Sequence, residues 1–170
     1  MRTDGIVNDR EPNEVHNGPR DFEQAVDMIR FIREKFGDFF TIAVAGYPNG
    51  HPESGSYVDD LFYLKAKIKA GADFVITQLF FDPQTFIRYE SDCRQLGITV
   101  PILPGIMPIQ SYKSLNQIIR LSQLPVPPEI EATVEKIRTN DEAIRKYGID
   151  LGVRICRGLF DAGVATGMYA

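Results

Sequence analysis

Two short segments of the sequence carry the side chains best suited to chemistry. The first follows Gly46 and displays a phenol, an imidazole and a carboxylate at Tyr47, His51 and Glu53. The second is the amide of Gln78, which directly follows an apolar run. A tyrosine ring can stack on a planar ligand, and a glutamine amide can pair with the edge of a heterocycle. The pattern indicates a binding site for a planar ligand that forms hydrogen bonds.

Each of these residues also has a simpler interpretation. His51 fits a loop histidine that bonds the backbone, and Tyr47 fits a core aromatic residue with a hydrated hydroxyl group. For Gln78, a ligand-binding role is slightly favoured over a structural one, because an otherwise buried strand would leave its amide unsatisfied. The sequence contains no GxGxxG, Walker or HExxH motif, so it gives no support for a Rossmann dinucleotide site, a phosphate loop or a zinc protease.

The candidate residues stand at the ends of predicted strands. Apolar, β-prone runs at residues 39–46, 74–78 and 100–106 predict three strands, and the first has the composition of a strand buried on both faces. Apolar periodicity and capping residues predict helices around them, at residues 21–36, 58–70, 82–96, 111–121, 128–138 and 141–162.

This alternation of strands and helices predicts an α/β fold of parallel βαβ units. Two architectures fit: a doubly wound open sheet, or part of a (β/α)8 barrel. Ligands bind at the carboxyl ends of the strands in both. A whole barrel takes about 250 residues and eight strands, so three strands would make an incomplete one.

Composition narrows the class of protein. The 170 residues are 44 % apolar, and 19 basic against 23 acidic side chains give a net charge of −4, which predicts no nucleic-acid partner. The two cysteines, Cys93 and Cys156, exclude a disulfide-rich scaffold, and no cysteine or histidine cluster predicts a metal site. No run predicts a membrane span or a secretory signal, so we expect a cytoplasmic protein.

Four segments together resemble the methylenetetrahydrofolate reductases, most closely the eukaryotic members. They are AGYPNGHPE at residues 45–53, GADFVITQLFF at 71–81, PILPGIMPI at 101–109 and NDEAIRKYGI at 140–149. The resemblance implies that residues 1–170 are a partial catalytic domain of that family, with a loop at 1–20 and βαβ units and C-terminal helices at 21–170. The family fold that it implies is a (β/α)8 TIM barrel.

The resemblance also implies an activity in one-carbon metabolism. NADH or NADPH would reduce 5,10-methylenetetrahydrofolate to 5-methyltetrahydrofolate, with ping-pong hydride transfer through FAD. The flavin-contacting positions that it implies are Gln24, Ala25, Ala45, Gly46, Tyr47, His51, Asp60 and Lys67.

Two further positions match folate contacts of the family. Gln78 matches the residue that bonds the pterin, and Asp4 matches an aspartate between flavin and pterin. Among the flavin contacts, Lys67 would meet the pyrophosphate and Asp60 the ribityl hydroxyls. The helical pattern by itself places Asp60 and Lys67 on a solvated charged face.

Two hypotheses stay open at this stage. In the first, the chain is one piece of the reductase, and the family's general-acid glutamate lies in a strand that would precede Met1. In the second, the chain is a non-catalytic flavin-binding fragment or pseudo-enzyme that lacks this acid. A half-barrel would expose apolar strand edges, which predicts assembly with another copy of the chain.

Overall fold

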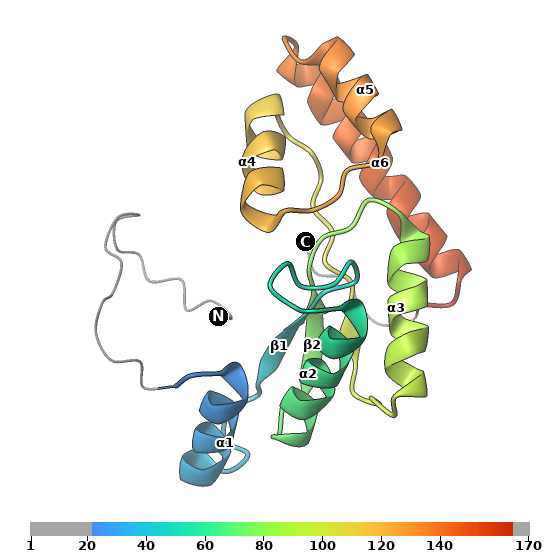
Figure 1. Ribbon diagram of the computed structural model, residues 1–170. Helices are drawn as coiled ribbons and strands as arrows, with labels where there is room; N and C mark the ends of the chain where they lie inside the picture. Colours follow the sequence, from blue (N-terminus) through green and yellow to red (C-terminus); the bar gives the residue numbers. More distant parts are fainter. Residues whose placement is uncertain (1–21, 165–170) are drawn as a thin grey trace.

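A computed structural model describes residues 22–164, and in this part of the chain three short parallel strands stand among six helices (Figure 1). The elements in chain order are α1 (Ala25–Phe36), β1 (Ala43–Gly46), α2 (Tyr57–Lys69), β2 (Phe74–Thr77), α3 (Pro83–Gln95), β3 (Ile102–Leu103), α4 (Tyr112–Ser122), α5 (Pro128–Ile137) and α6 (Asp141–Asp161). The predicted α/β fold of parallel βαβ units is confirmed, and such units build a (β/α)8 barrel.

The strands follow one another in the sheet in chain order, β1-β2-β3. Gly46 lies opposite Thr77 across β1 and β2, and Ile76 lies opposite Leu103 across β2 and β3. A parallel pair needs a crossover between its strands, which α2 and α3 provide. The carboxyl ends of all three strands therefore meet at one edge of the sheet.

The two faces of the sheet are unequally covered. Val75 and Ile102 lie opposite each other in the sheet and are fully buried. Tyr89 of α3 approaches the sheet on the side of Val75, and Figure 1 shows α2 and α3 beside the strands. Side chains alternate along a strand, so Ala45 and Ile76 belong to the other face, and both are only half-buried. The expectation that the first strand is buried on both faces is wrong for the described residues, because helices cover only one of them.

Helix boundaries follow local capping chemistry. Asp82 caps α3 by accepting a hydrogen bond from the backbone amide of Gln84 at 3.1 Å, and Pro83 opens the helix. Asn140 caps α6 in the same way through the amide of Ala143 at 3.0 Å. Both caps match the sequence prediction.

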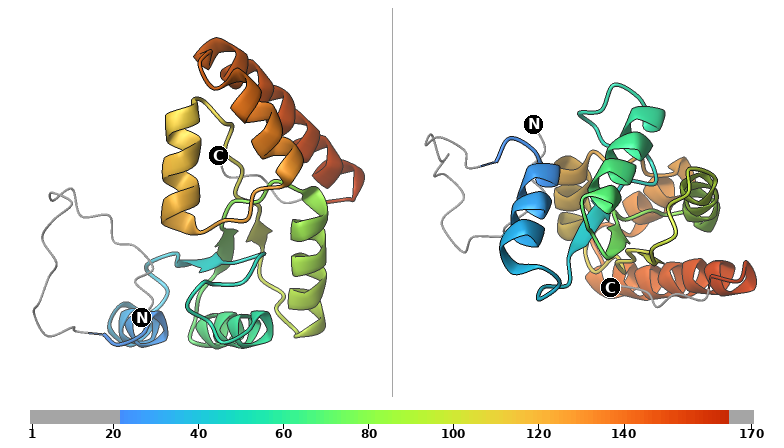
Figure 2. Two further views of the ribbon diagram at one scale, coloured as in Figure 1. Left: turned by 45° about the horizontal axis from the view of Figure 1, so that its top comes forward. Right: turned by 90° about the horizontal axis from the view of Figure 1, so that it is seen from below.

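The remaining helices extend the molecule away from α1. In Figure 2, α4 and α5 gather beyond the carboxyl ends of the strands, whereas α1 lies at the opposite end. Within the described residues, none of the helices has both the length and the apolar character that crossing a membrane would require.

The first helix and strand are shorter than their apolar runs predict. The helix begins at Ala25, after Gln24, whose side chain makes no capping bond, whereas the predicted helix began at residue 21. Phe39 and Phe40 precede β1 and are 81 % and 46 % exposed, with their rings packed edge to face 4.9 Å apart. The apolar composition of the run made the predicted strand too long at its start. In the structure the rings of Phe39 and Phe40 pack on each other, and neither residue belongs to β1.

Arg33 joins α1 to the sheet. Its guanidinium donates to the carbonyl oxygens of Gly71 at 2.8 Å and Phe40 at 2.7 Å, and to the carboxylate of Asp73 at 2.6 Å. That carboxylate also accepts from the backbone amide of Ile42 at 2.6 Å. The Ile42 amide and the Arg33 guanidinium together hold the pKa of Asp73 below its usual range.

Replacing Arg33 by alanine should lower the free energy of unfolding by about 2–3 kcal/mol, because several acceptors lose a charged donor at once. Arg30 supplies a matched control on the same helix, since its side chain is 60 % exposed and makes one 3.3 Å pair with Asp27. The variant Arg30→Ala should cost less than about 1 kcal/mol. Urea unfolding of both variants measures the difference, and equal losses would show that Arg33 does not join these elements.

Candidate functional site

The ends of β1 and β2 are held together by the backbone. The amide of Gln78, directly after β2, donates to the carbonyl oxygen of Gly46 at 2.7 Å. The side-chain oxygen of Gln78 accepts from the amide of Leu79 at 3.3 Å, while its amide nitrogen makes no hydrogen bond within residues 22–164. Two segments that are far apart in the sequence thus meet at the ends of neighbouring strands.

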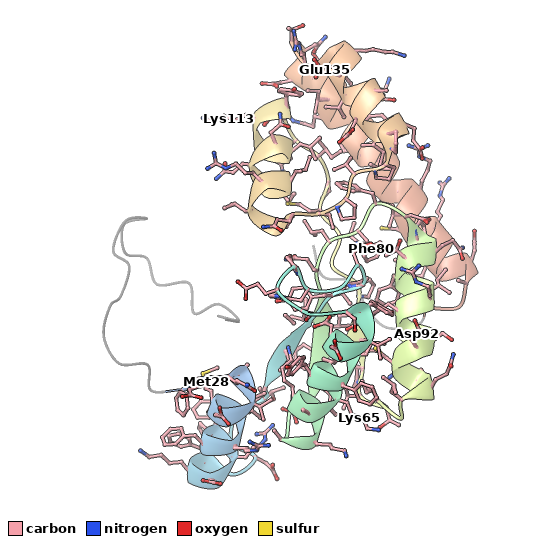
Figure 3. All side chains as sticks on the ribbon, viewed as in Figure 1. Met28, Lys65, Phe80, Asp92, Lys113 and Glu135 are labelled. Atoms are coloured by element: carbon pink, nitrogen blue, oxygen red, sulfur yellow. The ribbon has the colours of Figure 1, made fainter. Side chains whose placement is uncertain are left out.

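Phe80 anchors the segment that carries Gln78. Its side chain, labelled in Figure 3, is 3 % exposed, and its ring stacks on that of Phe86 in α3 with centroids 5.6 Å apart. This buried aromatic contact therefore holds the backbone segment that carries the Gln78 side chain.

Lys67 brings a cation to the same strand ends. Its side chain is 3 % exposed, and its Nζ atom donates to the carbonyl oxygen of Ala45 at 3.0 Å. The same nitrogen lies 6.0 Å from the centroid of the Tyr47 ring. A buried ammonium needs such partners, because removing it from water without them costs several kcal/mol.

Asp60 shares its helix with Lys67 and is 4 % exposed. The two lie about two helical turns apart, so they occupy the same face of α2. The solvated charged face that the helical pattern predicted for these two residues is wrong. Both turn inward, because the face of α2 that meets the sheet includes them beside Leu61 and Leu64.

Tyr47 and His51 lie in the loop between β1 and α2 and contact each other. Their ring centroids are 4.5 Å apart and their planes nearly perpendicular, at 86°. The Nδ1 atom of His51 accepts a hydrogen bond from the amide of Glu53 at 3.1 Å. The backbone bond predicted for a plain loop histidine is therefore present, and the ring also packs on Tyr47 beside the strand ends.

A cavity of about 250 Å³ opens beside these residues. Tyr47, His51 and Gln78 line it together. The sequence-based search missed two parts of its wall: Tyr57 at the start of α2, and residues 122–125 after α4. The predicted helix starts at residue 58, just after Tyr57, and residues 122–125 fall between two predicted helices, so neither gave a signal.

Not every predicted contact comes to the cavity. The predicted contacts that do not line it are Gln24 and Ala25 at the start of α1, Ala45 and Gly46 in β1, and Asp60 and Lys67 in α2. Asp4 lies outside the described residues. Within residues 22–164, no cluster of three or more histidine, cysteine or carboxylate side chains could hold a metal ion.

Gly46 is under steric constraint from the helix side of the sheet. A Cβ atom there would collide with the hydroxyl group of Tyr89 and lie 2.7 Å from Cγ1 of Val75. Tyr89 is 1 % exposed, and its hydroxyl group has no hydrogen-bond partner among the described residues. Burial raises the pKa of Tyr89 well above its usual range. The close approach of α3 thus requires glycine at the end of β1.

These features define a class of protein: a parallel α/β protein with a cavity at its strand ends that aromatic and amide side chains line. The sequence profile of one family, methylenetetrahydrofolate reductase, matches residues 2–169. The chain belongs to the methylenetetrahydrofolate reductase family.

Individual relatives agree with this assignment. The chain is 52 % identical over 146 residues to the probable methylenetetrahydrofolate reductase (NADPH) of Caenorhabditis elegans, covering 86 % of this chain and 22 % of the relative. It is 44 % identical over 154 residues to methylenetetrahydrofolate reductase (NADH) 1 of Zea mays, covering 85 % and 26 %. The chain thus spans about a quarter of the length of these relatives.

The fold is also similar to a solved structure. An uncharacterised protein from Clostridium thermocellum, described as binding two copies of 5-methyl-5,6,7,8-tetrahydrofolic acid, matches with a TM-score of 0.63 and 21 % identity. The match covers 82 % of this chain and 49 % of that one. At this identity the likeness supports the fold.

Replacing Gly46 by alanine should cost about 1–3 kcal/mol of stability, because the added methyl group overpacks a buried contact. Adding Tyr89→Phe should restore part of the loss, since the tyrosine hydroxyl is the nearest obstacle. Gly152→Ala is the control, because a Cβ at Gly152 has nothing within 4 Å. Thermal unfolding compares the variants, and a Gly46→Ala protein as stable as wild type would disprove the constraint.

Proposed function

We propose that this chain supplies flavin and folate contacts of an enzyme that reduces 5,10-methylenetetrahydrofolate to 5-methyltetrahydrofolate with NADH or NADPH. The observation that carries the proposal is the buried ammonium of Lys67 at the end of β1. It lies near the ring of Tyr47, which in turn contacts the ring of His51. Membership in the methylenetetrahydrofolate reductase family supports the reaction.

The residues present fit FAD. Lys67 offers a cation to a diphosphate, and the carboxylate of Asp60 on the same helix face can accept from ribityl hydroxyl groups. The rings of Tyr47 and His51, in contact after the end of β1, offer flat surfaces to a planar ring system. When bound, FAD supplies a two-electron carrier that takes hydride from the nicotinamide and gives it to the folate in alternating half-reactions.

Gln78 is the residue proposed to select the folate. The backbone bond from its amide to Gly46 fixes its place beside the flavin contacts, and its side-chain NH2 group can donate to a heterocycle. The description of the Clostridium thermocellum protein as a binder of 5-methyltetrahydrofolic acid supports a folate as ligand class. Relatives are named for NADPH in one case and NADH in another, so the proposal includes both.

Several predictions from the sequence stay predictions. These are the flavin contacts of Gln24 and Ala25, the ligand contacts of Asp4, the cytoplasmic location and the assembly with another copy.

Titration of the purified chain with FAD tests the proposal. Lys67→Met should weaken FAD binding about tenfold, which is the loss expected for one charge-assisted contact. Lys69→Met is the matched control, because Lys69 lies on the same helix and is exposed. Quenching of flavin fluorescence gives both dissociation constants.

The catalytic part of the proposal is tested by following NAD(P)H oxidation that depends on 5,10-methylenetetrahydrofolate. Gln78→Ala should raise the KM for the folate and leave FAD affinity unchanged. A folded chain that binds no FAD would contradict the proposal. A chain that binds FAD but shows no folate-dependent oxidation would favour the non-catalytic alternative.

A further inference from the structure

Tyr57 is the residue of the cavity wall that the resemblance does not assign. It is the first residue of α2, it is half-buried, and it lines the cavity with Tyr47, His51 and Gln78. Its ring packs against the core, which explains an aromatic residue there but not a hydroxyl group. The hydroxyl group of Tyr57 therefore needs an explanation other than core packing.

That hydroxyl group forms a bond between two helices. It donates to the Oδ2 atom of Asp92 in α3 at 2.9 Å, and the guanidinium of Arg88, one turn earlier in α3, lies 5.8 Å from the centre of the Tyr57 ring. Asp92 is labelled on α3 in Figure 3, beside α2. A hydrogen bond to a carboxylate is about twice as strong as one between neutral groups, so α3 holds the ring at both its hydroxyl group and its face.

Protonation keeps this bond in place. Burial and the Asp92 carboxylate both raise the pKa of Tyr57 above its usual range. The phenol therefore remains a donor at physiological pH, and the Arg88 cation, which opposes this shift, does not cancel it.

The ring of Tyr57 in turn borders the loop that carries His51. Gly50 has a φ of 80°, and a methyl group on its Cα would lie 3.9 Å from the Cβ and Cδ2 atoms of Tyr57. The loop is closed by its own turns, from the Gly50 amide to the Tyr47 carbonyl at 2.8 Å and from the Ser54 amide to the His51 carbonyl at 3.0 Å. Tyr57 and these turns are therefore neighbours on the wall of one cavity.

We propose that Tyr57 is a positioning residue: its bond to Asp92 fixes the ring, and the ring fixes the Gly50–His51 backbone and with it the imidazole beside Tyr47. The chain of contacts runs from α3 through Tyr57 to the loop after β1. The consequence for cofactor affinity rests on the proposed function, whereas the effect on the loop does not.

The first test measures the loop without any ligand. Tyr57→Phe and Asp92→Ala should each speed hydrogen exchange of the Gly50 and Ser54 amides by about three- to tenfold, the range expected for one lost hydrogen bond. The double variant should exchange no faster than the single variants, because both remove the same bond.

A matched control exists elsewhere in the molecule. Tyr112 in α4 donates to Glu135 in α5, also at 2.9 Å, at the end of the molecule far from the loop (Figure 3). Tyr112→Phe removes a bond of the same kind and should leave loop exchange unchanged. Unchanged exchange in Tyr57→Phe, or an equal change in Tyr112→Phe, would overturn the proposal.

The second test measures FAD affinity in the same variants. Tyr57→Phe and Asp92→Ala should weaken binding by a factor similar to their effect on exchange, with no change in Tyr112→Phe. Faster loop exchange with unchanged FAD affinity would overturn the positioning role. If the wild-type chain binds no FAD, the proposed function fails, and the exchange measurement alone decides whether Tyr57 fixes the loop.

Discussion

The buried ammonium of Lys67 sets the arrangement of the site. A cation that is 3 % exposed can persist only with partners, and here the carbonyl oxygen of Ala45 is one of them. This bond ties the last turn of α2 to the end of β1. It thereby fixes which face of α2 meets the sheet, and Asp60, about two turns earlier on that face, is buried with it.

The parallel sheet supplies the second constraint. Because β1 and β2 run in the same direction, the loop after β1 and the segment after β2 meet at one edge. The bond from Gln78 to Gly46 closes that edge, and Tyr89 of α3 supports it from the helix side. The cavity-lining residues Tyr47 and Gln78 and the packing contact at Gly46 therefore lie at the ends of the same two strands. A substitution at Gly46 would therefore also affect the backbone position of Gln78, which is bonded to it.

Much of this could be predicted from local sequence. The alternation of apolar runs and helices predicts the parallel sheet, and Asp82 with Pro83 marks the start of α3, because both signals act within a few residues. The burial of Asp60 and Lys67 could not be predicted from helical periodicity, which reads charged side chains as solvent-facing. Their inward direction depends on a strand-end carbonyl 22 positions away from Lys67. The cavity wall at residues 122–125 is also tertiary, since it comes from where α4 ends relative to the sheet.

The central claim is that the ends of β1 and β2 form the cofactor site. Mapping FAD-induced changes in amide chemical shifts across the chain tests it most directly. The account predicts that the changes concentrate at residues 45–51, around Lys67 and at Gln78, and leave α5 undisturbed. Changes centred on the groove between α4 and α5, where Leu115 and Val134 lie, would contradict the claim and place the ligand elsewhere.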